Sequence, residues 1–258
     1  MACSQSQMGS DTQTAAGCLE EAEAALANDS IRLGETLLRK SIRLAEESEN
    51  WHTNYIAYQR LAEALSQSNP EEALRLMKKA LTIYEQHPDD ERNNVILLDY
   101  AGTYASQVAF TTEGSFDEAL EFVNKAYDIA KKNQMTDLMC QTLTSLANIA
   151  WAKEEYYEAL NYAHQAESVA TDDLRPGTLQ VLARSYLDLD MLDSAETVYR
   201  QIEPGSTASG KRSGDIPAKL HPRTYGGNEE TQPERRFAHL SQSSRMERGR
   251  TYAQRHRQ

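Results

Sequence analysis

A repeated pattern of small residues constrains the fold of this chain more than any other feature of its sequence. In the pattern, a small residue is usually followed four positions later by a larger one, and three positions after that by another small one. The copies begin at Gly34, Ala73, Ala119, Ala159 and Ala195. Successive copies are therefore 39, 46, 40 and 36 residues apart. A period of this length is typical of a chain that stacks similar structural units.

Each unit is expected to contain α-helices. Apolar residues recur at three- and four-residue spacing through residues 17–203, and Ala, Leu, Glu and Lys are abundant there. Asn69-Pro70-Glu71-Glu72 offers an N-cap, a proline at the first helical position and early acids. Ser115-Phe116-Asp117-Glu118 has the form of a capping box, and Pro176 and Asp190–Asp193 mark further helix starts. Because antiparallel helices approach closely only where small side chains meet, the pattern predicts helical hairpins.

The pattern resembles the tetratricopeptide repeat. Ala147 and Ala183, each preceded by leucine, lie twelve residues upstream of Ala159 and Ala195, which is the spacing that this family has between its two helices. The resemblance implies an all-α solenoid of about five helical hairpins, wound into a right-handed superhelix, over residues 17–204. Its copies are expected at 17–48, 53–86, 92–132, 137–170 and 175–203. The alternative is a helical bundle without superhelical stacking.

One copy is longer than the family pattern. Between Gly102 and Ala119 the copy at 92–132 has five extra residues. The first helix of this copy is therefore expected to extend towards Thr112.

The distribution of charge divides the chain in two. Residues 1–204 hold 16 Lys and Arg against 34 Asp and Glu, whereas residues 205–258 hold 11 against 5. The acidic body argues against a nucleic-acid partner and would attract a basic one, although acidity also serves solubility.

Residues 205–258 are poor in apolar residues and show no period, so a disordered basic tail is expected. A shift of reading frame would produce the same abrupt change. Residues 1–16 are expected to form a flexible tether.

No arrangement of residues indicates an enzyme. The six histidines show no ligand spacing, the three cysteines are scattered, and Cys140 lies in an apolar stretch that is expected to be buried. Gly205 to Lys211 matches the glycine and lysine pattern of a phosphate-binding loop. However, Arg212 stands where Ser or Thr should ligate Mg²⁺, and a helix rather than a strand is expected before the loop. The chain is therefore predicted to be non-enzymatic, without cofactor or metal.

The family resemblance also implies a binding face for a protein or peptide. In the family, the first helix of each pair lines the concave face of the array. Carried over by position, the polar residues of that face are Gln59, Glu63, Asp99, Tyr100, Thr103, Gln141, Thr144, Asn148, Gln180 and Arg184. Trp151 and Leu187 lie one turn further along and are candidate apolar anchors, although Tyr100 and Trp151 could instead pack between repeats.

Two of these residues stand at corresponding positions of successive repeats. Asn148 and Arg184 are 36 residues apart and are predicted to hold a peptide backbone or a carboxylate. The chaperone-type carboxylate clamp of the family is not expected. Thr144 stands where that clamp needs a lysine, and Val181 stands where it needs an asparagine.

The ends of the chain suggest a cellular context. Met1-Ala2-Cys3-Ser4, followed by a polar stretch, resembles a bacterial lipoprotein processing site, so Cys3 is a lipidation candidate. The envelope is therefore favoured over the cytoplasm. With the repeats, this start resembles the sensor region of Bacteroidetes-type membrane regulators and predicts a sensory or adaptor part of a bacterial signalling system. The alternative is a structural subunit of an envelope-associated assembly. Val198 and Ile202 on the last expected helix predict self-association if nothing covers them.

Overall fold

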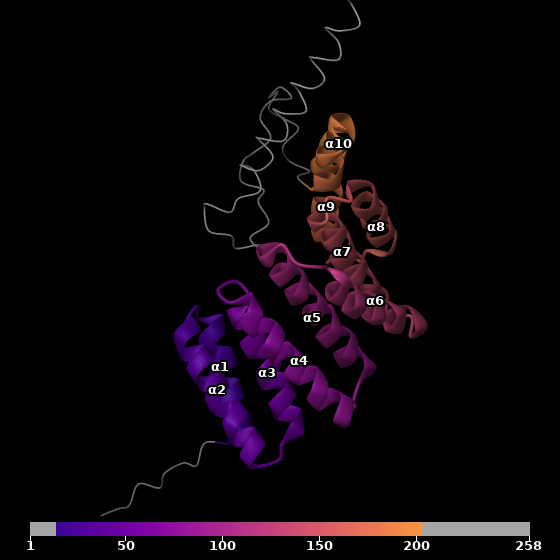
Figure 1. Ribbon diagram of the computed structural model, residues 1–258. Helices are drawn as coiled ribbons and strands as arrows, with labels where there is room; N and C mark the ends of the chain where they lie inside the picture. Colours follow the sequence, from indigo (N-terminus) through magenta and orange to yellow (C-terminus); the bar gives the residue numbers. More distant parts are fainter. Residues whose placement is uncertain (1–13, 203–258) are drawn as a thin grey trace, which may run out of the picture. The chain divides into compact units, whose positions relative to one another are not determined.

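The computed structural model describes residues 14–202 of the chain, and within this range all regular structure is α-helical (Figure 1). The helices are arranged in five consecutive pairs. In chain order they are α1 (Ala15–Ala27), α2 (Ile31–Glu47), α3 (Trp51–Leu65), α4 (Pro70–Gln86), α5 (Glu91–Thr112), α6 (Asp117–Lys132), α7 (Thr136–Ala152), α8 (Tyr156–Val169), α9 (Arg175–Asp188) and α10 (Leu192–Ile202).

The helices pack as a row of hairpins. The first and second helix of each pair pack along one another, and each second helix also packs against the first helix of the next pair. The first helices form a layer of their own, because α1 contacts α3, α5 contacts α7 and α7 contacts α9. The approach between α3 and α5 is weaker. The predicted all-α helical-hairpin repeat is confirmed, and the five pairs match the five expected copies to within two residues at each end.

Local signals in the sequence fix where several helices begin and end. The side-chain oxygen of Asn69 accepts a hydrogen bond from the Glu72 backbone N–H at 3.1 Å, and Pro70 is the first residue of α4, as predicted. α5 ends at Thr112, where the longer spacing placed its end, and Glu113 follows in the left-handed conformation with φ 53°. The capping box is wrong in detail: Ser115 Oγ accepts from the Asp117 backbone N–H, and α6 begins at Asp117 itself.

The small residues of the repeat lie where paired helices come closest. A Cβ atom added to Gly102 on α5 would lie 2.3 Å from Val123 Cγ2 and 2.9 Å from the Ala119 carbonyl oxygen, both on α6. A Cβ atom at Gly34 on α2 would lie 2.6 Å from the Leu26 side chain on α1. The small template residues on α4, α6 and α8 are buried in the same way. Repeated small residues therefore set the distance between the helices of each pair.

The apolar core runs between the two helix layers. It is continuous from the first hairpin into α7, and a further group that includes Leu179, Leu182 and Val198 joins α7 and α8 to the last hairpin. Cys140 is buried, as expected from its apolar neighbours. Along the described helices, none combines the length and the hydropathy that a membrane crossing needs.

Several sequence predictions fall outside residues 14–202. These are Cys3, most of the tether expected over residues 1–16, the Gly205 to Lys211 segment and the tail 205–258. α1 begins at Ala15, so its first two residues belong to the stretch that was expected to be tether.

Adding one methyl group at the closest helix contact tests this account of the packing. Gly102→Ala is expected to lower the free energy of unfolding by about 1–3 kcal/mol, because α5 and α6 must separate to admit it. Gly177→Ala on α9 is the matched control, since a Cβ atom there meets nothing within 4 Å. The control should be neutral or stabilising by up to about 1 kcal/mol. Urea denaturation measures both, and equal effects at the two sites would contradict the account.

Candidate functional site

The residues predicted for binding lie on the first helices, whose shared side is called here the first-helix face. Asp99 differs from the other predicted residues because it is buried: it is only 3% exposed, and it lies between α5 and α7. Gln180 on α9 is exposed. The remaining predicted residues are partly buried: Gln59, Glu63, Tyr100, Thr103, Gln141, Thr144, Asn148, Trp151, Arg184 and Leu187.

Three of the predicted residues meet between α7 and α9. The Arg184 guanidinium donates from Nη2 to Asn148 Oδ1 at 2.6 Å, and its Cζ lies 4.4 Å from the centre of the Trp151 ring. Trp151 Nε1 donates to Asp188 Oδ2. We call Asn148, Trp151, Arg184 and Asp188 the Trp151 cluster. Asp188 was not predicted: it lies one helical turn after Arg184, but that spacing does not show that it meets Trp151 on the preceding first helix.

The charged side chains of the Trp151 cluster, Arg184 and Asp188, are partly shielded from water. Burial raises the pKa of Asp188, while the Trp151 hydrogen bond and the Arg184 charge favour its ionised form. Burial also raises the pKa of Tyr199 on α10. The charge of Arg184 lowers the pKa of this phenol, and the charge of Asp188 raises it. The pKa of Tyr156, at the start of α8, is raised to about 12 by burial and by the charges of Glu154 and Asp188. The cluster therefore offers an oriented guanidinium, an amide and an aromatic ring to a ligand.

A second junction joins α5 to α7 through a buried acid. Gln141 Nε2 donates to Asp99 Oδ2 at 2.8 Å, while Oδ1 is buried without a hydrogen bond. Burial raises the pKa of Asp99, although the nearby Gln141 and Ser145 side chains favour the ionised form. The position-based prediction put Asp99 on the open face. Its place is instead inside the α5–α7 contact, because these two first helices pack more closely than the spacing alone could show.

A third group lies across α1, α3 and α5. Arg60 donates to Glu23 on α1 and to Glu63 on its own helix, at 3.0 Å in each case. Gln59 Nε2 donates to the other oxygen of Glu63 at 2.9 Å. Tyr100 stacks on Tyr104 with ring centres 6.0 Å apart and planes at 12°. Sequence reasoning found Gln59, Glu63 and Tyr100 but missed Arg60, whose only signal is its position beside Gln59.

The other predicted residues do not join these groups. The Thr144 hydroxyl donates to the Cys140 carbonyl of its own helix at 2.9 Å. Thr103 is half-buried on α5, and Gln180 and Leu187 lie on α9 beside the Trp151 cluster in sequence but outside it.

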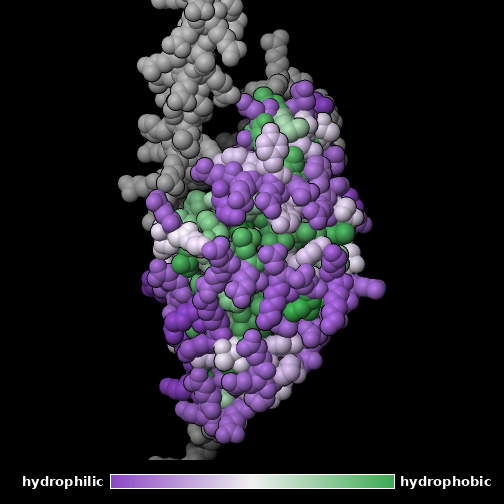
Figure 2. Space-filling view, turned by 45° about the vertical axis from the view of Figure 1, so that its right-hand side comes forward, coloured by the Kyte–Doolittle hydropathy of each residue, from purple (hydrophilic) through white to green (hydrophobic). Residues whose placement is uncertain are grey.

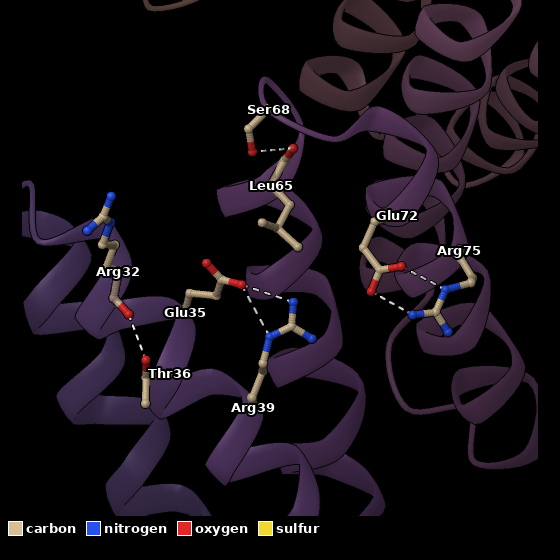
Figure 3. A network of polar contacts seen from close by, with 8 residues as sticks. All are labelled: Arg32, Glu35, Thr36, Arg39, Leu65, Ser68, Glu72 and Arg75. Atoms are coloured by element: carbon tan, nitrogen blue, oxygen red, sulfur yellow. Dashed lines mark hydrogen bonds and ion pairs between the residues drawn. The ribbon is translucent and has the colours of Figure 1, made fainter.

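The second helices carry a different kind of polar surface. Figure 3 shows Glu35 paired with Arg39 within α2, and Glu72 paired with Arg75 within α4, at 3.0 and 2.6 Å. These pairs are exposed and lie within one helix, so each contributes little to stability. Lys78 to Glu118 is an exposed link between α4 and α6. On the first helices, several polar side chains link successive repeats: Arg60 to Glu23, Gln141 to Asp99 and Arg184 to Asn148.

Two shallow hollows open between second helices. One, of about 210 Å³, lies over α5 between α4 and α6, with Leu98 and Phe122 in its lining. The other, of about 300 Å³, lies over α9 between α8 and α10, with Leu182 and Val198 in its lining. Figure 2 shows a largely polar face on which apolar residues gather near the middle. Among the described residues, no three His, Cys, Asp or Glu side chains gather as a metal site would need.

Comparison with known proteins bears on the fold. No protein-family model matches the chain, and no curated protein matches it in sequence. Among solved structures, a Podospora anserina kinesin light chain protein with nearly identical TPR-like repeats is 17% identical at a TM-score of 0.58, covering 73% of this chain and 93% of that one. This chain has the fold of tetratricopeptide-like helical repeat proteins.

Two further structures have the same fold over most of this chain. A Signal Transduction ATPase with Numerous Domains from Pyrococcus horikoshii, which has a tetratricopeptide repeat sensor, is 16% identical with a TM-score of 0.61. The match covers 77% of this chain but only 31% of that protein. BtubC from P. vanneervenii is 13% identical with a TM-score of 0.60, over 80% of this chain and 87% of that one. At these identities the likeness establishes the fold alone.

The buried carboxyl of Asp99 gives a testable pH dependence. Its pKa is higher in the folded than in the unfolded chain, so the folded chain binds more protons between those two values. Its contribution to the free energy of unfolding is therefore most stabilising at low pH, and this stabilisation is lost as the pH rises through the folded pKa. Asp99→Asn should make the protein more stable than wild type at neutral pH by about 1–3 kcal/mol, and the gain should shrink towards pH 4.

Asp137→Asn is the control, because the pKa of Asp137 is shifted in the opposite direction to that of Asp99. The Arg92 hydrogen bond lowers the pKa of Asp137, so this carboxylate stabilises the folded chain above its unfolded pKa and that contribution is lost on acidification. Urea denaturation of both variants at several pH values separates the two cases. A neutral-pH loss of stability in Asp99→Asn would show that the buried carboxylate is well compensated.

Proposed function

We propose that this chain is a non-enzymatic scaffold that binds a protein or peptide segment on its first-helix face. The observation that carries the proposal is the Trp151 cluster, in which Asn148 and Arg184 from successive repeats meet on that face. The tetratricopeptide-like fold supports it, since such arrays present extended surfaces of this kind. Similarity at 17% identity or below transfers no partner, so the proposal rests on the residues of this chain.

The geometry of the cluster suits recognition of a peptide. Arg184 is held from one side by the Asn148 amide oxygen and from below by the Trp151 ring, so its guanidinium is oriented before a ligand arrives. A side chain that is already ordered loses less entropy on binding. The guanidinium suits a carboxylate or a backbone carbonyl, and the ring of Trp151 suits an apolar anchor.

We further propose a signalling context for this binding. The resemblance of the repeats to the sensor region of Bacteroidetes-type regulators supports a sensory or adaptor role, and so does the likeness to a protein with a tetratricopeptide repeat sensor. A partner that binds one arrangement of neighbouring hairpins better than another would shift the array towards that arrangement. Such a shift is what an attached output element would detect.

The test is a double substitution in the cluster. Peptides are first selected from a displayed random library on the wild-type chain. Asn148→Ala combined with Arg184→Ala should then weaken their binding roughly tenfold or more, about 1.4 kcal/mol, with unchanged helicity. Arg200→Ala, an exposed residue on the second helix α10, is the matched control and should bind as wild type. Fluorescence anisotropy measures the affinities, and full binding by the double variant would exclude the first-helix face.

A subunit of a larger assembly is the second candidate. Large apolar side chains are exposed at the first and last described hairpins: Ile31 at 49%, Leu33 at 55%, Met191 at 42% and Leu192 at 57%. Exposed apolar groups of this kind mark contact surfaces when they gather.

The assembly candidate predicts oligomers that depend on these side chains. Leu33→Ser and Leu192→Ser should each shift the chain towards the monomer in light scattering coupled to size-exclusion chromatography. A wild-type chain that stays monomeric at high concentration would leave only the scaffold that binds a peptide.

A further inference from the structure

The hollow of about 300 Å³ over α9, called here the α9 hollow, has apolar side chains at its base. Leu179, Leu182 and Val198 are buried in its lining, and they come from α9 and α10. Its other lining residues carry polar groups, which include one carboxylate, that of Glu167, but no lysine or arginine. The α9 hollow therefore suits an apolar side chain that is accompanied by a positive charge.

Residue size at matching positions of the repeat explains why the α9 hollow is open. Between α6 and α8 these positions hold Tyr127 and Tyr162, two large side chains that pack against the core. The matching residues around the α9 hollow are Glu167 and Val198, which lie 40 and 36 residues later, as the spacing of the copies requires. Valine is much smaller than tyrosine, and the Glu167 carboxylate favours water over an apolar floor. A side chain from another molecule can therefore occupy space that the tyrosines fill at the preceding junction.

The start of α2 presents the complementary arrangement, two apolar side chains on either side of a base. Ile31 and Leu33 are exposed, and Arg32 lies between them in the chain. In Figure 3 the contact drawn at Arg32 involves its backbone carbonyl, which accepts a hydrogen bond from Thr36 Oγ1 at 2.8 Å. Across residues 14–202 the Arg32 guanidinium pairs with no carboxylate, so it is available to a carboxylate of another molecule.

The two surfaces carry opposite charge. Residues 31–43 hold four basic residues and one acidic residue, which gives a net charge of +3. The helices α8 and α10, on either side of the α9 hollow, hold four acidic residues and one basic residue, which gives −3. The basic residues of α2 are Arg32, Arg39, Lys40 and Arg43, and the acidic residues of α8 and α10 are Glu158, Glu167, Asp193 and Glu196. Electrostatic attraction therefore favours contact between these surfaces, although the body as a whole is acidic.

Two copies of the chain are needed to bring these surfaces together. α2 packs against α1 and α3 in the first two hairpins, whereas α8 and α10 pack against α7 and α9 in the last two. The second and third hairpins of the row lie between them. The start of α2 therefore meets an α9 hollow only on another molecule.

We propose that the start of α2 in one copy of the chain docks in the α9 hollow of a second copy. Leu33 packs on the apolar floor, and Arg32 pairs with Glu167 of the second copy. The inference rests on the second candidate function, the subunit of a larger assembly, and names the two surfaces that join. Because the two surfaces differ, each added copy leaves one of each free, so the copies associate head to tail.

The test changes each surface separately in the full-length chain. Leu33→Ser removes the apolar side chain of α2, and Val198→Tyr fills the α9 hollow with the residue that Tyr162 supplies at the matching position. In light scattering coupled to size-exclusion chromatography, the wild-type mass should grow with concentration. Each variant should need a concentration about tenfold higher or more to reach the same mass. Phe110→Ser removes another exposed apolar side chain, and this matched control should associate as wild type does.

Mixing the two variants tests the head-to-tail arrangement. The Leu33→Ser chain keeps an intact hollow and the Val198→Tyr chain keeps an intact α2, so an equal mixture should form dimers and nothing larger. A mixture that stays monomeric would overturn the inference, and so would equal losses in Phe110→Ser and Leu33→Ser. Thermal melting checks that each variant is folded. Glu167→Arg, which should also weaken association, replaces Val198→Tyr in the mixture if that variant is unfolded.

Failure of this inference is distinguishable from failure of the proposed functions. Oligomers that persist unchanged in Val198→Tyr and Glu167→Arg would overturn the inference and leave an assembly subunit that joins through other surfaces. A wild-type chain that stays monomeric at high concentration would overturn the inference and the assembly candidate together. Neither result bears on the peptide-binding scaffold, which is tested separately through Asn148 and Arg184.

Discussion

The close approach of two helices at small side chains is the contact on which the rest of this structure depends. At Gly102 the backbone of α5 comes so near α6 that even one carbon atom would collide with Val123 and with the Ala119 carbonyl. Small buried residues recur in the other hairpins, where alanines stand at the helix contacts in place of glycine. Hairpins built at one fixed separation can stack in a row, and stacking brings the first helices side by side. The candidate binding face exists because of that layer.

Most of the polar contacts between successive repeats lie on the first helices. On the second helices, pairs such as Glu35–Arg39 lie within one helix and are exposed to water. On the first helices, Arg60 reaches Glu23, Gln141 reaches Asp99 and Arg184 reaches Asn148, each across a repeat boundary. Cross-repeat contacts are sensitive to the angle between hairpins. A ligand that competes for them, or adds to them, therefore acts on the geometry of the array as well as on one side chain.

Sequence was sufficient for the features that depend on local spacing. The five helix pairs, the N-cap at Asn69 and the extension of α5 to Thr112 all follow from residues close together in the chain. The burial of Asp99 and the contribution of Asp188 could not be predicted in the same way. Both depend on how far one first helix is rotated towards the next, and no residue spacing within a repeat specifies that angle. The roles of Asn148 and Arg184 in binding stay predictions, although the structure brings them together.

Site-specific photo-crosslinking tests most directly whether a partner sits on the first helices. A photoreactive amino acid is placed either at Gln180, exposed on the first helix α9, or at Thr82, exposed on the second helix α4. Each chain is then irradiated with a bound library-selected peptide. Binding on the first-helix face predicts crosslinked peptide from position 180 and none above background from position 82. Crosslinking from position 82 alone would place the partner on the second helices and contradict the account.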